Sequence, residues 1–575
     1  MLICCQLLTL LIASACNFDM VTEQDVDKRL RVWESAFSWI TNCVVNHSGC
    51  HKQFLKSCRR PRRLIAVGDR DSEVLLRKSS TLEPETLYVT LSHCWGPKGV
   101  PFKLQKANES TLSERIPIDK LSLTFKDAIR FTRRLRILGV RYIWIDALCI
   151  IQDSEEDWQD QAFIMGEIYG SAFCNLAACT GPDGSSGLYP HSDGISRRLC
   201  TLKAGASSCI SGSFAVRDRN VMRSSQNKST ILSRAWCVQE LMLAPRVLYF
   251  AHNHTVWECS ALLAEDSLPT RHIDLKDGYD FSSGRKFRYK GGKADTTSRA
   301  ASLVSEAEDS FPFNYYSAWM EAILTYTECD LTYHTDRLVG ISGIARLIHA
   351  GLGEKEKYIA GLWGNYLPLH LVWEVRSTHK NYRLWPYRAP SWSWASVEGR
   401  VYNFLTNSEA VSSCTTFVQV SAEVDLATTD PFGPVRGAIL HLKGPVFKAF
   451  LGSRGHTSAK HLCRLFIDAG DNARQDKGPE CIVEHPIHLD FDYPGHEPVR
   501  VYCILVMTTA IQDQIAGLLL VPQEDSKVRG RYIRIGISHN LPSKLLVLAR
   551  NSWRLGDDRE YEAEIKGGDY QISIV

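Results

Sequence analysis

The hydrophobic residues between about positions 61 and 260 follow two alternating patterns. Short, almost uninterrupted apolar runs occur at 87–91, 141–146 and 173–178, and runs of this kind are typical of strands buried on both faces of a sheet. Segments with apolar residues at helical spacing separate them. Strands that alternate with helices predict an α/β domain, with a mainly parallel sheet and flanking helices.

Two polar signals mark where the helices between these strands should begin. Thr124 with Asp127 forms a capping-box pattern ahead of a segment that runs toward Gly139, and Ser154 with Asp157 forms a second one. In such a box the first side chain accepts a hydrogen bond from a backbone N–H that the helix leaves unpaired. We therefore predict a helix start at both places.

The chain outside residues 61–260 divides by composition into four parts. Residues 1–60 are expected to be helical, because 26–45 carries apolar residues at helical spacing. Residues 261–312 are rich in Gly, Lys, Ser and Asp, which is typical of an exposed loop or linker. Residues 313–400 predict a helical, Trp-rich extension whose tryptophans fill an interdomain core rather than a ligand cage. Residues 401–575 predict a β-rich C-terminal domain.

The first 18 residues form an uncharged, apolar segment that ends in small residues. The segment resembles a secretory signal, but it lacks the basic start of one and is marginal for a membrane span. The cysteine pattern described below suits a reducing compartment. We therefore expect a cytoplasmic protein that has no membrane partner.

Positive and negative charges are nearly balanced, with 67 Lys and Arg residues against 64 Asp and Glu residues. The net charge of +3 is too small to indicate a nucleic-acid partner or an anionic membrane. A dense basic run precedes the first core strand and consists of Arg59, Arg60, Arg62 and Arg63. We interpret it as a solvent-exposed segment that leads into this strand, a solvated lead. A phosphate-binding or targeting role is the less favoured alternative.

Nineteen cysteines are present, and no two are spaced as C-x-x-C. Most lie inside apolar runs, as small buried hydrophobic residues do in a reducing compartment. Cys43, His47, Cys50, His51 and Cys58 lie close enough in sequence to be considered as zinc ligands, but their spacing matches no common zinc finger. We therefore predict local packing there and no metal site.

A carboxylate stands inside the apolar, aromatic segment 234–241, which reads RAWCVQEL. If this segment is helical, Glu240 lies on the same face as Trp236. A carboxylate that is partly removed from water beside an aromatic ring can stabilise positive charge or exchange protons. The alternative is a structural ion pair with Arg234 or Arg246.

Common catalytic motifs are missing, since the sequence has no Walker loop, G-x-G-x-x-G, H-E-x-x-H or G-x-S-x-G pattern. Four other blocks follow one another: YVTLSHCWG at 88–96, YIWIDALCIIQD at 142–153, MGEIYGSA at 165–172 and RAWCVQE at 234–240. In this order they resemble the fungal heterokaryon incompatibility (HET) domain over about residues 61–260. Further blocks extend the likeness to about residue 400.

The resemblance implies a fungal protein of nonself recognition, in which the HET domain triggers cell death when incompatible individuals meet. HET domains are considered distant relatives of Toll/interleukin-receptor (TIR) domains, which implies a TIR-like or flavodoxin-like sheet. The segment WCVQEL at 236–241 is similar to the TIR helix W-C-x-x-E-L, whose Glu is the catalytic residue of NAD cleavage. By this likeness Glu240 is the catalytic candidate, NAD is the candidate substrate, and no cofactor or metal is required.

The expected NAD contacts lie beyond the carboxyl ends of strands, where open α/β sheets bind ligands. Trp95 is suited to stack on a base or on nicotinamide, Gly96 permits close backbone approach, and Arg234 can bind a phosphate. Core packing is the alternative for Trp95 and Trp236, and an ion pair is the alternative for Asp146 and Arg234. The predicted contact residues are Ser92, Trp95, Gly96, Asp146, Arg234 and Trp236.

Two other classes of function stay open. A non-enzymatic signalling module would act by self-association through the HET domain and with an unidentified protein partner. A thiol hydrolase would use Cys94 with His93 or His252. Neighbouring residues of a strand point to opposite faces, so His93 is poorly placed for that chemistry.

Overall fold

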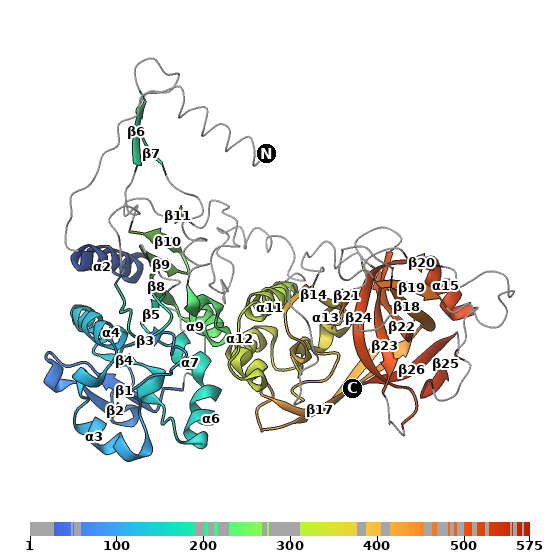
Figure 1. Cartoon of the computed structure of the whole chain (residues 1–575), viewed down its shortest axis with the longest axis horizontal. Coiled ribbons are helices and arrows are strands. Elements are labelled where there is room, and N and C mark those ends of the chain that lie inside the picture. The colour runs from blue at the N-terminus through green and yellow to red at the C-terminus, as the bar shows by residue number, and fades with distance from the viewer. Residues whose placement is uncertain are drawn as a thin grey trace. The chain divides into compact units, whose positions relative to one another are not determined.

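The computed structural model divides the chain into two compact units, Met1–Leu303 and Val304–Val575 (Figure 1). The expected apolar segment 1–18, most of the expected linker 261–312, and His51 and Cys58 lie outside the described residues. No helix within the described residues is long and apolar enough to cross a membrane. The structure describes residues 28–47, 50, 59–189, 200–204, 212–216, 229–252, 254–266, 273–274, 311–376, 387–403, 414–453, 463–467, 481–483, 488–490, 499–508, 514–523, 528–551, 555, 560–565 and 568–575.

A nine-stranded sheet forms the centre of the first unit, in the order β11-β10-β9-β8-β5-β3-β4-β1-β2. A separate hairpin pairs β6 (Cys200–Ala204) with β7 (Gly212–Val216). The strands of the large sheet are β1 (Arg63–Ala66), β2 (Leu75–Lys78), β3 (Tyr88–Ser92), β4 (Tyr142–Trp144), β5 (Cys174–Ala178), β8 (Arg246–Phe250), β9 (Thr255–Cys259), β10 (Leu262–Glu265) and β11 (Ile273–Asp274).

Only the central strands β8, β5, β3 and β4 are parallel to one another. The outer strands run antiparallel to their neighbours, so the sheet is mixed, whereas the sequence predicted a mainly parallel one. The connections from β1 to β2 and from β8 through β9 to β10 are shorter than the roughly dozen residues that a parallel crossover needs. These short connections force antiparallel pairing at both edges.

The parallel strands follow a doubly wound order. Across the sheet these strands lie in the order β4, β3, β5, β8. If they are numbered 1 to 4 along the chain, this spatial order is 2-1-3-4. This is the beginning of a flavodoxin-like strand order, in which the direction of winding changes between the first and third strands. The switch point, where such sheets bind ligands, therefore lies between β3 and β5.

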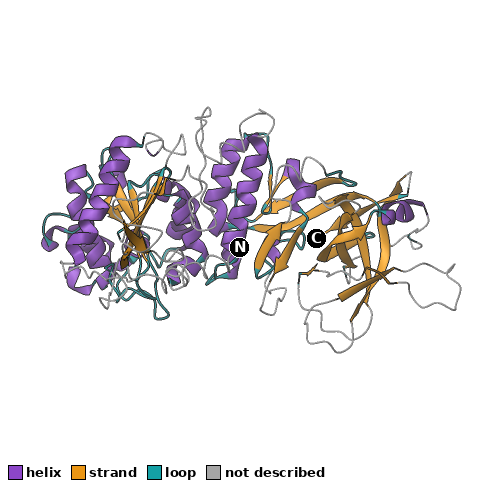
Figure 2. Ribbon diagram, turned by 90° about the horizontal axis from the view of Figure 1, so that it is seen from above, coloured by secondary structure: helices purple, strands orange, loops and turns teal. Residues whose placement is uncertain are grey.

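Helices cover both faces of this sheet (Figure 2). The α4 helix buries Phe125 and Ile129 against the core, and the strands contribute Val89, Ile143 and Leu176, all almost fully buried. Long apolar runs were therefore correctly predicted to be buried on both sides. The helices of this unit are α2 (Lys28–Asn46), α3 (Glu109–Glu114), α4 (Leu123–Arg134), α5 (Asp146–Cys149), α6 (Glu155–Phe163), α7 (Met165–Gly170) and α9 (Ala235–Leu243).

The α4 helix begins earlier than the sequence predicted. Ser122 is its N-cap, and the Ser122 hydroxyl accepts the hydrogen bond from the backbone N–H three residues on, at 3.4 Å. Thr124 instead donates its hydroxyl to the Gly184 carbonyl, and the Asp127 carboxylate accepts from the Leu188 N–H. The predicted capping box was wrong because both of its side chains bind a loop that is distant in sequence.

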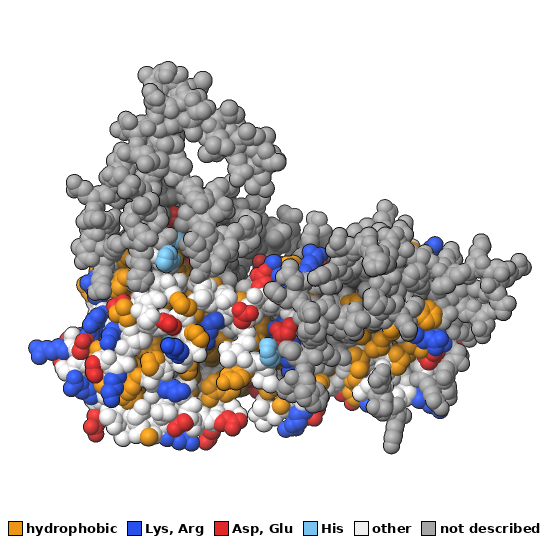
Figure 3. Space-filling model, in the orientation of Figure 1, with side chains coloured by type: hydrophobic (Ala, Val, Ile, Leu, Met, Phe, Trp, Pro, Cys, Tyr) orange, Lys and Arg blue, Asp and Glu red, His pale blue; other side chains and the backbone are white. Residues whose placement is uncertain are grey.

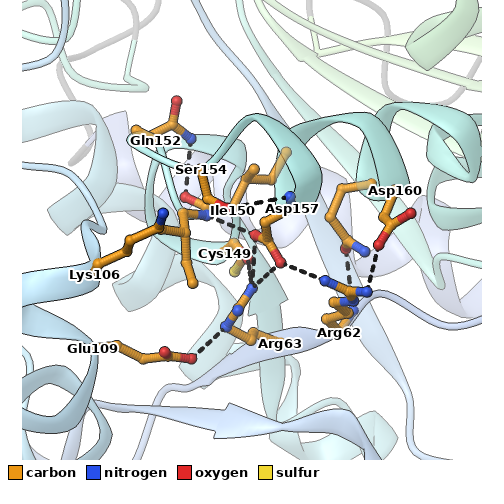
Figure 4. A network of polar contacts seen from close by, with 12 residues as sticks. Arg62, Arg63, Lys106, Glu109, Cys149, Ile150, Gln152, Ser154, Asp157 and Asp160 are labelled. Carbon is orange, nitrogen blue, oxygen red and sulfur yellow. Dashed lines mark hydrogen bonds and ion pairs between the residues drawn. The ribbon is translucent and has the colours of Figure 1, made fainter.

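Two arginines of the basic run, Arg62 and Arg63, are held by carboxylates at the start of β1 (Figure 4). Asp157 donates its N–H to the Ser154 hydroxyl, which confirms the second predicted helix start. The Asp157 carboxylate accepts from Arg62 and from Arg63, each at 2.9 Å, and Glu109 accepts from Arg63 at 2.8 Å. Arg59 and Arg62 are about half exposed, as the interpretation of the run as a solvated lead expected, but Arg63 is buried, so that interpretation was wrong for Arg63. A guanidinium can be buried here because carboxylates pair with it.

The second unit begins with a helical section and continues into a large sheet. Its helices are α11 (Phe311–Thr327), α12 (Ser342–Leu352), α13 (Leu367–His370) and α15 (Lys544–Asn551). Two hairpins pair β12 (Tyr358–Ile359) with β13 (Leu362–Trp363) and β14 (Trp373–Arg376) with β15 (Arg400–Asn403). The sheet, which confirms that the C-terminal part is β-rich, contains β16 (Gln419–Leu426), β17 (Val435–Gly444), β18 (Val446–Ser453), β19 (Cys463–Ile467), β20 (Cys481–Val483), β21 (His488–Leu489), β22 (Val499–Thr508), β23 (Gln514–Pro522), β24 (Arg531–Pro542), β25 (Ala563–Ile565) and β26 (Asp569–Ile574).

Tryptophans fill the helical section of this unit. Trp392 and Trp394 are fully buried, and the indole N–H of Trp394 donates to the Gly361 carbonyl at 2.9 Å. Trp319 donates to the same carbonyl at 3.0 Å. These tryptophans were correctly predicted to lie in a core, and that core lies inside the second unit.

Charged side chains of both signs are interspersed on the face of the molecule drawn in Figure 3. This mixture agrees with the nearly balanced count of acidic and basic residues in the sequence. A surface of this kind produces little long-range field of a single sign.

Candidate functional site

A chain of buried polar side chains crosses the switch point and ends at Glu240. Ser92, the last residue of β3, donates its hydroxyl to Glu240 Oε2 from α9. Asn175 of β5 donates Nδ2 to Ser92 Oγ at 2.9 Å, and Thr90 of β3 donates its hydroxyl to Asn175 Oδ1 at 3.0 Å. All four side chains are buried. Hydrogen bonds therefore fix the position of the Glu240 carboxyl from the sheet side.

Burial sets the protonation of Glu240. Removal of the carboxyl from water raises the pKa of Glu240 to about 7, and the negative charge of Asp146 adds to the rise. The hydrogen bond from Ser92, the charge of Arg234 and a hydrogen bond from Tyr169 each lower that pKa. Protonated and ionised forms therefore coexist near neutral pH, a property that acid–base catalysis requires and that clusters at functional sites.

Arginine does not form the structural ion pair that was the alternative for Glu240. In the described part of the chain, neither Arg234 nor Arg246 forms a salt bridge with this carboxylate. Arg234 donates to the His93 carbonyl at 2.8 Å, and Arg246 donates to the Phe173 carbonyl at 3.1 Å. Arg234 acts on Glu240 only through its charge.

Asp146 and Trp95 form a second group at the same edge of the sheet. The Trp95 indole N–H donates to Asp146 Oδ2 at 2.8 Å, and Asp146 Oδ1 accepts from the Ala147 N–H at 2.6 Å. His93 Nε2 lies 3.7 Å from Asp146 Oδ1. Burial lowers the pKa of His93, which keeps its ring neutral near pH 7. Asp146 therefore orients the half-buried Trp95 ring beside β3.

Gly96 has a structural reason to be glycine. Its φ is +74°, and a Cβ added there would lie 2.6 Å from the Cβ of Asp183. Residues with a side chain rarely adopt such a φ, and the close approach leaves no room for one. The absence of a side chain at Gly96 therefore lets the loop at Asp183 approach the backbone closely.

Trp236 packs against another tryptophan. Its ring packs edge-on against Trp158 of α6, with the ring centroids 6.3 Å apart. Trp236 is half-buried against the core of the first unit. The packing alternative therefore describes Trp236, and the structure brings Ser92, Asp146, Arg234 and Glu240 together without it.

Sequence reasoning missed Asn175 and Tyr169 of the site, and also Thr90, which joins the site through Asn175. Asn175 stands in the otherwise apolar run 173–178, and a polar side chain in such a run was the available signal. Tyr169 of α7 donates its hydroxyl to the Leu91 carbonyl at 3.4 Å and also hydrogen-bonds to Glu240. Both contacts depend on strand order, which a local pattern does not reveal.

The thiol of Cys94 contacts a hydroxyl group rather than a histidine base. Its Sγ donates to Thr230 Oγ1 at 3.3 Å. The His93 ring packs edge-on against Phe125, with the centroids 4.9 Å apart. Among the residues that the structure describes, no histidine nitrogen pairs with the Cys94 thiol, so the geometry does not favour a thiol hydrolase.

Comparisons with known proteins place the site inside a recognised region. Residues 88–240 match the family described as Heterokaryon incompatibility protein (HET). A stretch of 97 residues is 30% identical to Heterokaryon incompatibility protein 6, OR allele, of Neurospora crassa, and it covers 16% of this chain and 14% of that relative. No solved structure matches the chain. The matched region begins at β3 and ends at Glu240.

Proposed function

Because the chain contains a HET domain at residues 88–240, we propose that it acts in fungal heterokaryon incompatibility, the process that its Neurospora crassa relative is named for. In this proposal the domain triggers cell death by cleaving NAD, as a TIR-like domain does. One observation carries the enzymatic part: the buried Glu240 carboxyl, with its pKa raised to about 7, is held by Ser92 at the switch point of the sheet.

The proposed reaction hydrolyses the bond between nicotinamide and ribose. The electron pair of that bond moves to the ring nitrogen, so neutral nicotinamide leaves and positive charge develops on the ribosyl carbon. Ionised Glu240 stabilises this charge, as carboxylates do in glycoside hydrolysis. Water then adds to the ribosyl carbon and releases a proton, which leaves ADP-ribose.

The positive nicotinamide ring of bound NAD favours the ionised form of Glu240. An opposite charge close to a carboxyl lowers its pKa, so substrate binding converts the mixed population at neutral pH into carboxylate. Ser92 and Asn175 orient the carboxylate during this step, because both are already in the hydrogen-bonded chain that ends there.

A second candidate, a non-enzymatic self-association module, is favoured by a different observation. The groups expected to bind NAD are engaged inside the protein: Ser92 with Glu240, the Trp95 indole with Asp146, and the Arg234 guanidinium with a backbone carbonyl. Polar networks that are fully satisfied stabilise one specific packing. In that case Glu240 maintains the fold of a domain that signals through its surface.

The deciding experiment measures nicotinamide release by the purified full-length chain. Wild type is compared with Glu240→Gln and with Glu258→Gln, which alters another buried carboxylate, one that accepts from the Tyr249 hydroxyl at 2.7 Å. We expect Glu240→Gln to reduce the rate on the order of 10²- to 10³-fold, as loss of one electrostatic stabiliser does. Glu258→Gln should retain most of the rate.

Folding and self-association are controlled in the same series. Thermal unfolding must show that Glu240→Gln is folded, and wild type is assayed at concentrations that force association. Equal rates for wild type and Glu240→Gln would reject the catalytic role. If wild type releases no nicotinamide, and induced expression of Glu240→Gln still kills fungal cells, the self-association module is the better description.

A further inference from the structure

Four metal-ligating side chains from distant parts of the first unit meet beside the sheet. Cys43 and His47 lie on α2 or directly after it, Cys50 follows shortly after, and Cys259 is the last residue of β9. One ligand atom of each lies within 4.8 Å of all the others. Figure 1 shows α2 beside β9, which is how the two halves of the cluster are brought together.

The spacing of the ligand atoms fits a tetrahedral zinc ion. Zinc binds thiolate sulfur at about 2.3 Å and imidazole nitrogen at about 2.0–2.1 Å, which places neighbouring ligand atoms about 3.5–3.8 Å apart. Cys259 Sγ lies 3.4 Å from His47 Nδ1. Only small movements of the side chains would centre an ion among them.

The charge around the cluster also fits. Three thiolates and one neutral imidazole around Zn²⁺ carry a net charge of about −1. Arg246 is buried beside them, with Nε 3.2 Å from Cys43 Sγ and Nη2 3.2 Å from the Cys50 carbonyl. Its third acceptor is the Phe173 carbonyl.

Arg246 therefore lacks a carboxylate partner among the described residues. A buried guanidinium beside neutral thiols would leave its charge uncompensated, which is costly. Thiolates bound to a metal supply the missing negative charge. The same arginine would then act as an outer-shell partner that holds the ligands in place.

We propose that Cys43, His47, Cys50 and Cys259 bind one zinc ion. Four protein ligands without an open position are typical of a structural site, and sulfur with nitrogen in a tetrahedral set favours zinc over calcium or magnesium. The ion joins the end of α2 to β9. It thereby fixes a helix whose Val32 and Trp39 are buried in the core of the first unit. This site is separate from Glu240 and does not depend on NAD cleavage.

Metal analysis of the full-length protein, purified without chelators, tests this proposal. We expect about one zinc per chain in wild type and none in Cys259→Ser. Cys149→Ser is the matched control, because Cys149 is also buried in the first unit but lies outside the cluster; it should retain the metal. Cobalt added to metal-free wild type should produce the visible bands of tetrahedral thiolate coordination, and these bands should be lost in Cys259→Ser.

A second variant covers the case in which Cys259→Ser does not fold. His47 is half-buried, so His47→Ala removes a ligand with less effect on packing. It should lower zinc affinity by more than the roughly 10- to 100-fold that loss of an outer-shell partner costs. Chelation of wild type should lower its unfolding temperature.

Two results would overturn the site. The protein has no zinc site if metal-free wild type gives no cobalt spectrum and chelation leaves the unfolding temperature of wild type, as purified, unchanged. A disulfide found between two of the three cysteines by non-reducing mass spectrometry would assign the cluster to redox chemistry instead.

Discussion

Glu240 should make the protein less stable as pH rises, and Glu240→Gln should remove that dependence. The pKa of this carboxyl is about 7 in the folded chain and 4.5 for an ordinary Glu. Between these values the folded state keeps a proton that the unfolded state has lost. The stability that the protonated carboxyl contributes is therefore complete below about pH 4.5 and is lost as pH rises through about 7.

The size of the effect follows from the pKa difference. The difference between 7 and 4.5, at about 1.36 kcal/mol per pKa unit, corresponds to about 3 kcal/mol of unfolding free energy. About 2 kcal/mol of this falls between about pH 5.5 and about pH 8. Gln has a similar shape, cannot ionise, and keeps an oxygen that can accept from Ser92.

Hydrogen exchange measured by mass spectrometry gives the free energy of opening for the slowest amides of β3 and β5. Wild type, Glu240→Gln and the control Glu258→Gln are compared over that pH range, after correction for the intrinsic exchange rate. We expect wild type and Glu258→Gln to lose stability together relative to Glu240→Gln. Parallel pH profiles for all three proteins would show that Glu240 does not titrate with a raised pKa.

Three further predictions concern the same unit. Ser92→Ala removes a donor to the carboxylate, so it should raise the pKa of Glu240 further and cost about 1–3 kcal/mol, measured by the same exchange experiment. The pKa of Asp157 is lowered, because hydrogen bonds from Arg63, Arg62 and a backbone N–H outweigh the effect of burial, which raises it. The ionised Asp157 carboxylate therefore stabilises the fold above about pH 3.8, and this stabilisation is lost as the pH falls through the lower folded pKa. Asp157→Asn should therefore weaken the acid dependence of urea unfolding and cost roughly 3–5 kcal/mol at neutral pH, since it breaks a buried ion pair. Gly96→Ala should lower the unfolding temperature more than Gly99→Ala does, because both have positive φ but only the first meets a neighbouring side chain.

Local patterns predicted three central strands of the first unit, but they said much less about how its elements are arranged. The apolar runs at 87–91, 141–146 and 173–178 correspond to β3, β4 and β5, because continuous burial leaves a continuous apolar signal. The direction of the edge strands was missed. It depends on the length of the connections and on which strands become neighbours.

Side chains with distant partners were misjudged for a related reason. Arg63 was expected in solvent, but Asp157, far along the chain, makes its burial possible. Thr124 carried a valid capping pattern, yet Gly184 offers its hydroxyl a tertiary acceptor. A sequence pattern shows only which nearby groups a polar side chain could hydrogen-bond to. Whether it binds one of them or a partner distant in sequence depends on the tertiary structure.

The sequence by itself determined three central strands of the sheet, β3, β4 and β5, the likeness to the HET domain and the candidate role of Glu240, because the signal for each lies in contiguous residues. Only the tertiary structure decided that β3 lies next to β5, which joins Ser92 and Asn175 to Glu240. It also decided that Cys259 joins Cys43, His47 and Cys50 in one cluster. These contacts between residues distant in sequence follow from strand order and helix packing. Both depend on interactions across the whole unit, and neither leaves a periodic pattern in the sequence.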